Sequence, residues 1–207
     1  MRGIFAAVLL LASVSATAAD ACGRATLPGD VHQVIPQNGI DDLLLDVAIR
    51  AEVNRMRCGY GLPPVNRAPD RLASVANDHS VWMAGSGRLS HKSTARGRQT
   101  LGQRIAASQV RVQVASENLA VLPRYRFGDR RFFVENAGAC RFKTTRGETV
   151  KAHTYYTMSK EVVARWMASP GHRRNILDPS ARALSTAGAG SQSGTCGRVW
   201  ITQKFVG

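Results

Sequence analysis

Acidic residues are scarce in this sequence of 207 residues: 14 Asp and Glu stand against 28 Lys and Arg, which gives a formal net charge of +14. A field of this size favours anionic partners such as lipid headgroups, lipopolysaccharide, cell-wall polymers or nucleic acid. The basic residues are scattered along the chain. Aromatic residues make up only 6% of it and do not alternate with the basic ones, as they would in a single-strand nucleic-acid binder. We therefore expect a lipid or an anionic envelope polymer as partner, and nucleic acid is disfavoured.

Long hydrophobic runs are missing after the first 19 residues. The apolar run at residues 4–12 follows Arg2 and is too short for a membrane span, which needs about 20 apolar residues. Small residues fill positions 13–19 and offer cleavage sites of the small-x-small type near Ala18 or Ala19. These features predict a signal peptide over residues 1–19 and a soluble protein that is secreted or periplasmic. An uncleaved anchor is the alternative.

Cysteine is also rare, and no two cysteines form the C-x-x-C pair of a zinc site. An oxidising compartment favours two disulfides among the four cysteines, but four cysteines allow three pairings and the sequence alone does not choose among them. We favour Cys22–Cys58, which would tie an irregular N-terminal arm at residues 20–40 to the end of the first helix. The other pair, Cys140–Cys196, would then staple a mid-chain insertion to the C-terminal strands.

Helical periodicity and capping residues predict four helices in the rest of the chain. The first, of about 16 residues, is capped by Asp41 or Asp42 and stops near Gly59. The second begins near Pro69 and ends at residues 85–87. A short third helix covers about 100–108, and a fourth runs from Ser159, as N-cap, to Ala168.

Alternation of apolar and polar residues predicts the strands. One strand is expected at 110–114, an extended hairpin at 131–142 and 148–157 around a turn at 144–147, and two C-terminal strands at 184–190 and 198–205. About 190 residues after the signal peptide fit one domain, at 41–207. The order of elements predicts an α+β fold, with helices packed in layers on a mostly antiparallel sheet.

Polar residues with chemical potential stand at three predicted element ends: His91 in "RLSH", Glu117 in "SENLA" and His172 in "SPGHRRNIL". Two imidazoles and a carboxylate can hold zinc with an open position, or transfer protons near neutral pH. The structural alternatives are histidines that only hold a turn and a glutamate that only accepts backbone N–H groups. His79 lies on the apolar face of the second helix, which indicates a core histidine rather than a ligand.

Four segments in this order resemble a bacterial CAP domain, the superfamily of cysteine-rich secretory proteins, antigen 5 and pathogenesis-related 1 proteins. They are "VNRMRCGYG…GSGRLSH", "SENLAV", "VVARWMASPGHRRNIL" and "VWITQKF", spread over residues 43–206. The resemblance implies a three-layer α-β-α sandwich with a surface cleft of two histidines and two acids. His91, Glu117 and His172 match that set, whereas Ser169 stands at the position of the second acid. Residues 123–157 are expected to form a hairpin insertion relative to the family.

These observations predict an exported module of the cell envelope that binds a divalent cation such as zinc, or a lipid, in the cleft. We expect Ser169, Pro170 and Gly171 to form the turn that aims His172 into it, with Gly171 supplying unusual backbone angles. A metal-assisted hydrolase that uses His91, Glu117 and His172 is one alternative. It is the less favoured one, because no G-x-S-x-G or H-E-x-x-H motif is present. A basic protein that docks a partner through the insertion is the other.

Overall fold

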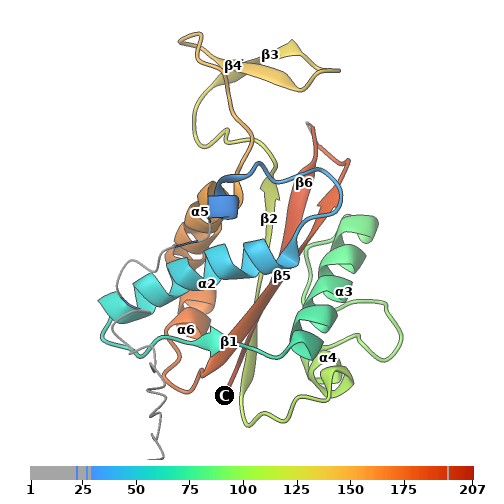
Figure 1. Ribbon diagram of the computed structural model, residues 1–207. Coiled ribbons are helices and arrows are strands. Elements are labelled where there is room, and N and C mark those ends of the chain that lie inside the picture. Colours follow the sequence, from blue (N-terminus) through green and yellow to red (C-terminus); the bar gives the residue numbers. More distant parts are fainter. Residues whose placement is uncertain (1–21, 23–26, 28, 195) are drawn as a thin grey trace, which may run out of the picture.

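A four-stranded sheet forms the middle layer of the molecule (Figure 1). The computed structural model describes residues 22, 27, 29–194 and 196–207, so the predicted signal peptide at 1–19 lies outside the described residues. The sheet order is β1 (Asn66–Arg67), β5 (Ala183–Ser191), β6 (Arg198–Val206) and β2 (Ala115–Pro123). The pairs β5–β6 and β6–β2 are antiparallel, but β1 runs parallel to β5. The sheet is therefore mixed.

Helices cover both faces of this sheet. On one face lie η1 (Gly29–His32), α2 (Asp42–Gly59), α5 (Tyr155–Ala168) and α6 (Pro170–Ile176), which share a hydrophobic cluster with the strands. On the other face lie α3 (Asp70–Ser86) and α4 (Leu101–Ser108), whose apolar residues form two smaller clusters against β2 and β6. The α-β-α sandwich is confirmed, and β2 is an edge strand with helices on either side.

Two carboxylates, one buried and one partly buried, fix α2 to β5. Asp41 caps the helix, and two further aspartates accept hydrogen bonds from strand amides: Asp42 from Gly188 and Asp46 from Thr186, each at 2.8 Å. Burial raises the pKa of both carboxyl groups, and the hydrogen bonds oppose the shift. These contacts set the position of the helix along the strand, in addition to apolar packing.

The helix predicted with Ser159 as its N-cap begins five residues earlier than expected, at Tyr155, with Thr154 as the N-cap. The Thr154 hydroxyl accepts from the Thr157 amide at 3.1 Å, and the Thr157 hydroxyl accepts from the Thr154 amide at 2.9 Å. This reciprocal capping box satisfies two helix N–H groups. Ser159 lies inside the helix, where its hydroxyl donates to the carbonyl of Tyr156. The predicted N-cap at Ser159 is therefore wrong.

The strand predicted at 110–114 is wrong. Residues 110–114 are not in a strand, and β2 begins at Ala115. Val110 and Val112 pack against the α3–α4 cluster, while the amides of Gln113 and Val114 donate to the carbonyl of Gly207. The alternating valines at 110–114 therefore belong to an irregular segment. It packs against α3 and α4 and forms hydrogen bonds with the C-terminal residue.

Residues 123–157, which we expect to be an insertion relative to the family, contain a hairpin, but its turn differs from the predicted one. Strands β3 (Phe132–Asn136) and β4 (Arg141–Thr144) pair around residues 137–140, not around 144–147 as predicted. Figure 1 shows this hairpin projecting away from the sandwich, beyond the ends of β2 and β6. The turn includes Cys140, which is bonded to Cys196 and has a positive φ of 50°. A tertiary bond thus lies at the turn, which local periodicity could not indicate.

Both predicted disulfides are confirmed. Cys22–Cys58 and Cys140–Cys196 each have a Cα–Cα distance of 5.7 Å, within the usual range. The first joins the N-terminal arm to the last turn of α2, and the second joins the insertion to the segment between β5 and β6. Among the described residues, no helix is both long and apolar enough to cross a bilayer.

Candidate functional site

The edge strand β2 places two consecutive polar residues on opposite faces of the sheet. Glu117 is paired in register with Lys204 of β6, and both side chains lie on the face covered by α3 and α4. Asn118 points to the other face and donates to Gln203 at 3.2 Å and to the carbonyl of His172 at 3.3 Å. Because side chains alternate along a strand, one dipeptide contacts both helical layers.

Glu117 is surrounded by three donors. Arg104 of α4 donates from Nη2 to both carboxylate oxygens, at 2.8 and 3.0 Å. Lys204 forms an ion pair with Oε2, and Nδ1 of His91 lies 2.9 Å from Oε1. The side chains of Glu117, Arg104 and Lys204 are at most 1% exposed, whereas His91 is 57% exposed. We call Glu117, Arg104, Lys204 and His91 the edge cluster. Three of its side chains are buried, and the imidazole of His91 lies at the surface.

The electrostatics of the edge cluster favour an ionised Glu117. Burial raises its pKa, but the hydrogen bond from His91 and the charges of Lys204 and Arg104 outweigh burial and bring the pKa to about 2. Burial lowers the pKa of Lys204 to about 8, against the attraction of Glu117. At neutral pH two buried cations therefore face one buried carboxylate.

This carboxylate determines the tautomer of His91. Because ionised Glu117 only accepts hydrogen bonds, Nδ1 of His91 must carry a proton, which makes Nε2 the acceptor in the neutral form of the ring. Within the part of the chain that the structure describes, no hydrogen bond engages Nε2. Arg104 also donates to the carbonyl of His91 at 3.0 Å, so one guanidinium holds both the carboxylate and the histidine backbone.

His172 approaches the same strand from the other layer. It lies in α6, which Pro170 opens at its first position, and Asn175 of that helix donates to the Glu117 carbonyl at 3.1 Å and to Asn118 at 2.8 Å. Burial lowers the pKa of His172, and the charge of His91 lowers it further. The helix that carries His172 is thus tied to the strand that carries Glu117, the partner of His91.

The turn predicted before His172 is in fact the first turn of this short helix. Ser169 lies between α5 and α6, and Gly171 is inside α6 without a positive φ. The expected special backbone angles at Gly171 are therefore absent, and this expectation was wrong. His172 is displayed by a regular helix fastened to β2 through Asn175 and Asn118.

The predicted three-ligand metal set needs a different assignment of roles. No group of three or more His, Cys, Asp or Glu side chains is arranged for a metal ion among the described residues. Glu117 already accepts from three donors, two of them cations, so a metal would have to displace them. Glu117 therefore fits the role of an orienting group behind His91 better than that of a metal ligand.

Sequence reasoning missed Arg104 and Lys204. The signal that could have found them is a charged residue at a position where the helix or strand pattern calls for an apolar one. Arg104 precedes the inward-facing Ile105 in a short amphipathic helix, and Lys204 lies in a strand whose last eight residues are all buried. Charged groups are almost never fully buried unless they are paired, so each implied a buried acid.

The buried His79 supports the loop that carries His91. His79 is 2% exposed, its Nε2 lies 3.0 Å from the carbonyl of Ser90, and its ring stacks on Trp82. Burial lowers its pKa to about 4, so the ring is neutral at neutral pH. The prediction of a core histidine is confirmed, and the contact with Ser90 fixes the backbone immediately before His91.

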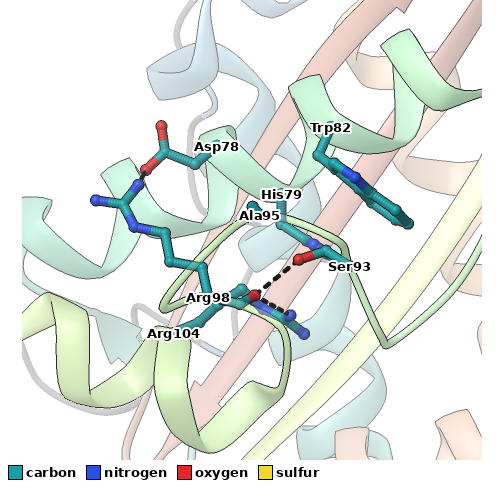
Figure 2. Close-up of a pocket in the computed structure, with 7 residues that line it drawn as sticks. All are labelled: Asp78, His79, Trp82, Ser93, Ala95, Arg98 and Arg104. Carbon is teal, nitrogen blue, oxygen red and sulfur yellow. Dashed lines mark hydrogen bonds and ion pairs between the residues drawn. The ribbon is translucent and has the colours of Figure 1, made fainter.

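Figure 2 shows a small pocket beside this loop, where Ser93 and Arg104 both donate to the carbonyl of Arg98. Arg98 and Asp78 form an ion pair at one side. The pocket has a volume of about 120 Å³, below the roughly 300–1,000 Å³ of typical small-molecule sites. It is too small for a sterol or an acyl chain.

Comparison with known proteins agrees with this architecture. Residues 50–205 match the sequence profile of the cysteine-rich secretory protein family, CAP. An extracellular protein of Bacillus anthracis that contains an SCP domain superposes with a TM-score of 0.53 at 21% identity, over 80% of this chain and 41% of that one. A cysteine-rich secretory protein of Staphylococcus aureus gives 0.46 at 16% identity, over 80% and 39%.

The chain thus spans less than half the length of these two proteins. An outer surface protein of Borrelia burgdorferi gives a TM-score of 0.48 at 14% identity, over 76% of this chain and 89% of that one. No curated protein sequence matches the chain.

Proposed function

Because the chain belongs to the cysteine-rich secretory protein family, we propose that it is an exported module that binds a divalent metal ion such as zinc through His91 and His172. The observation that carries this proposal is the hydrogen bond between Nδ1 of His91 and the buried, ionised Glu117. Histidines that bind metals commonly donate their second nitrogen to a carboxylate, which fixes the ring and raises its basicity.

The second imidazole supports the same chemistry. Only the neutral form of histidine binds a metal, and the lowered pKa of His172 keeps that residue neutral at neutral pH. Two protein ligands leave the remaining positions of a tetrahedral ion to water or to a ligand. Such an ion would supply Lewis acidity to a bound group, while the chain would contribute the orientation of His91 through Glu117.

The edge cluster is poorly suited to the hydrolase alternative. A general acid or base works best with a pKa near the operating pH, and the pKa of Glu117 is about 2. The carboxylate is also enclosed by Arg104 and Lys204, so it is not free to accept a proton from water. Binding rather than hydrolysis is therefore the function that these contacts favour.

Export of the module is supported by three features. The sequence predicts a signal peptide at residues 1–19, and both cysteine pairs are bonded, as is usual in oxidising compartments. The Bacillus anthracis protein is described as extracellular. A position in the cell envelope follows as part of the proposal.

Isothermal titration calorimetry with zinc at neutral pH tests the site. We expect His91→Ala and His172→Ala each to weaken zinc binding by more than about tenfold, since each removes one of two protein ligands. His32→Ala is the matched control, because this exposed histidine packs beside Tyr156, on α5. Equal affinity in the wild type and the double variant His91→Ala/His172→Ala would refute the site, as would equal losses in the control.

A further inference from the structure

Three consecutive apolar side chains of β3 are exposed on the projecting insertion. Phe132, Phe133 and Val134 have exposed fractions of 39%, 50% and 49%, and every residue of β3 is exposed. We call residues 124–152 the hairpin segment. Single exposed apolar residues are ordinary on protein surfaces, but three in a row on a protruding element mark a contact surface.

The hairpin segment is a built element. Phe127, Phe142 and Val150 form a small core of their own, and Phe132 stacks on Phe127 with ring centroids 4.1 Å apart. The disulfide of Cys140 fastens the turn between the two strands to the segment between β5 and β6. Since this core and the disulfide hold the hairpin in place, Phe133 and Val134 stay exposed in the folded protein.

The charge of the hairpin segment selects the partner. It has eight basic residues and three acidic ones, a net charge of +5 within a span of 29 residues. The basic residues are Arg124, Arg126, Arg130, Arg131, Arg141, Lys143, Arg146 and Lys151. Two copies of such a segment would repel each other, whereas an anionic surface would attract it.

Some of these arginines line a hollow next to Phe132. Arg130, Arg131 and Arg146 surround it, together with Thr144, Thr145 and Glu148, and its volume is about 330 Å³. The acid is only loosely engaged, since Glu148 lies 3.9 Å from Arg130 and is 64% exposed. Three guanidinium groups around one hollow provide the donors that a phosphate recognises.

We propose that the hairpin segment docks the protein on an anionic phospholipid bilayer. Phe133 and Val134 enter the boundary between headgroups and acyl chains, and the arginines of the hollow bind lipid phosphates. Apolar side chains flanked by basic ones are the combination that binds peripheral proteins to such surfaces. The docking is independent of the proposed metal site, because neither His91 nor His172 belongs to the hairpin segment.

Co-sedimentation with vesicles tests the docking on the full protein with both disulfides. We expect binding to phosphatidylcholine vesicles that contain phosphatidylglycerol, and much weaker binding to phosphatidylcholine alone. Phe133→Ser should reduce the partition coefficient about tenfold, because it removes an aromatic side chain that docking would bury in the bilayer. Arg131→Glu should reduce it by at least on the order of tenfold, since the headgroup layer repels the new charge.

Matched controls separate the hairpin segment from the general charge of the protein. Leu43→Ser removes an equally exposed apolar side chain (53%) from α2, and Arg71→Glu reverses an exposed charge on α3. Both controls should bind vesicles like the wild type. In addition, Phe133→Trp should be quenched by brominated acyl chains, and Leu43→Trp should not.

Three results would overturn the proposal. If the control variants lose as much vesicle binding as the hairpin variants, the binding comes from the general charge of the protein and not from the hairpin segment. Unquenched fluorescence in Phe133→Trp would exclude insertion of this strand. Dimers of the wild type that Phe133→Ser abolishes, without vesicle binding, would identify a second copy as the occupant of the surface. Vesicle binding that persists in His91→Ala/His172→Ala would keep this proposal separate from the metal site.

Discussion

The edge cluster and the hairpin segment use the same residue types in opposite environments. In the edge cluster, Glu117 forms ion pairs with Arg104 and Lys204, and all three side chains are almost inaccessible to solvent. In the hairpin segment, Glu148 and Glu135 contact basic residues that stand in water, at 3.9 and 2.9 Å. Removing one partner of a buried ion pair strongly lowers the free energy of unfolding, whereas an exposed ion pair contributes little to it. The first arrangement can orient a side chain, and the second is free to meet a partner.

Removal of the carboxylates should give the largest difference between the two regions. Glu117→Ala leaves two buried cations without their anion and should lower the free energy of unfolding by about 3–5 kcal/mol. Glu148→Ala, in the hairpin segment, should change it by no more than about 0.5 kcal/mol. Urea unfolding followed by circular dichroism measures both. Similar losses in the two variants would contradict the contrast drawn here.

The second disulfide provides an intermediate effect. Cys140→Ser/Cys196→Ser removes the bond that fastens the hairpin turn, and the loss of such a crosslink costs about 2–4 kcal/mol in typical proteins. Because the bond joins the insertion to the sandwich, the damage should be concentrated in the insertion. We expect faster tryptic cleavage after Arg130, Arg131 and Arg146, with the sandwich left intact. Mass spectrometry of the fragments locates the cuts, and first cuts in α2 or β6 would argue against a separate hairpin unit.

Acid should destabilise the protein through protonation of His79, which supports the loop before His91. The loss of stability per pH unit should be smaller than the effects of the two preceding changes. The pKa of His79 is about 4 when folded and 6.5 ordinarily, so the unfolded chain takes up this proton first. Its contribution is complete above pH 6.5 and is lost as the pH falls toward 4. Glu117, with a pKa of about 2 against 4.5, extends the loss from pH 4.5 toward 2.

The variants separate these two contributions. His79→Gln should flatten the dependence of the urea midpoint between pH 6.5 and 4.5, while Glu148→Gln should retain the slope of the wild type. An unchanged slope in His79→Gln would show that His79 does not titrate in this way.

Local sequence signals predicted the elements whose ends are marked by their own residues. Asp41 capped α2, Pro69 preceded α3, and Thr100 capped α4, all near the expected positions. The predictions failed where a distant partner decided the outcome. Residues 110–114 do not form a strand, because Gln113 and Val114 bond to Gly207. The turn of the hairpin includes Cys140, which is bonded to Cys196. Periodicity cannot register a partner that lies more than 50 residues away.

The sequence by itself determined the class of fold, through short-range pattern and four motifs in order, and it named His91, Glu117 and His172 as candidates. The structure decided among the three possible cysteine pairings, in favour of the one we preferred. Only the tertiary structure decided what Glu117 does. Strand register brings Lys204 opposite it, and α4 brings Arg104. The loop after α3 brings His91 to its carboxylate, and α6 is fastened to its backbone carbonyl through Asn175. A carboxylate has no fixed role in a sequence, because its pKa and its partners depend on which groups the fold buries beside it.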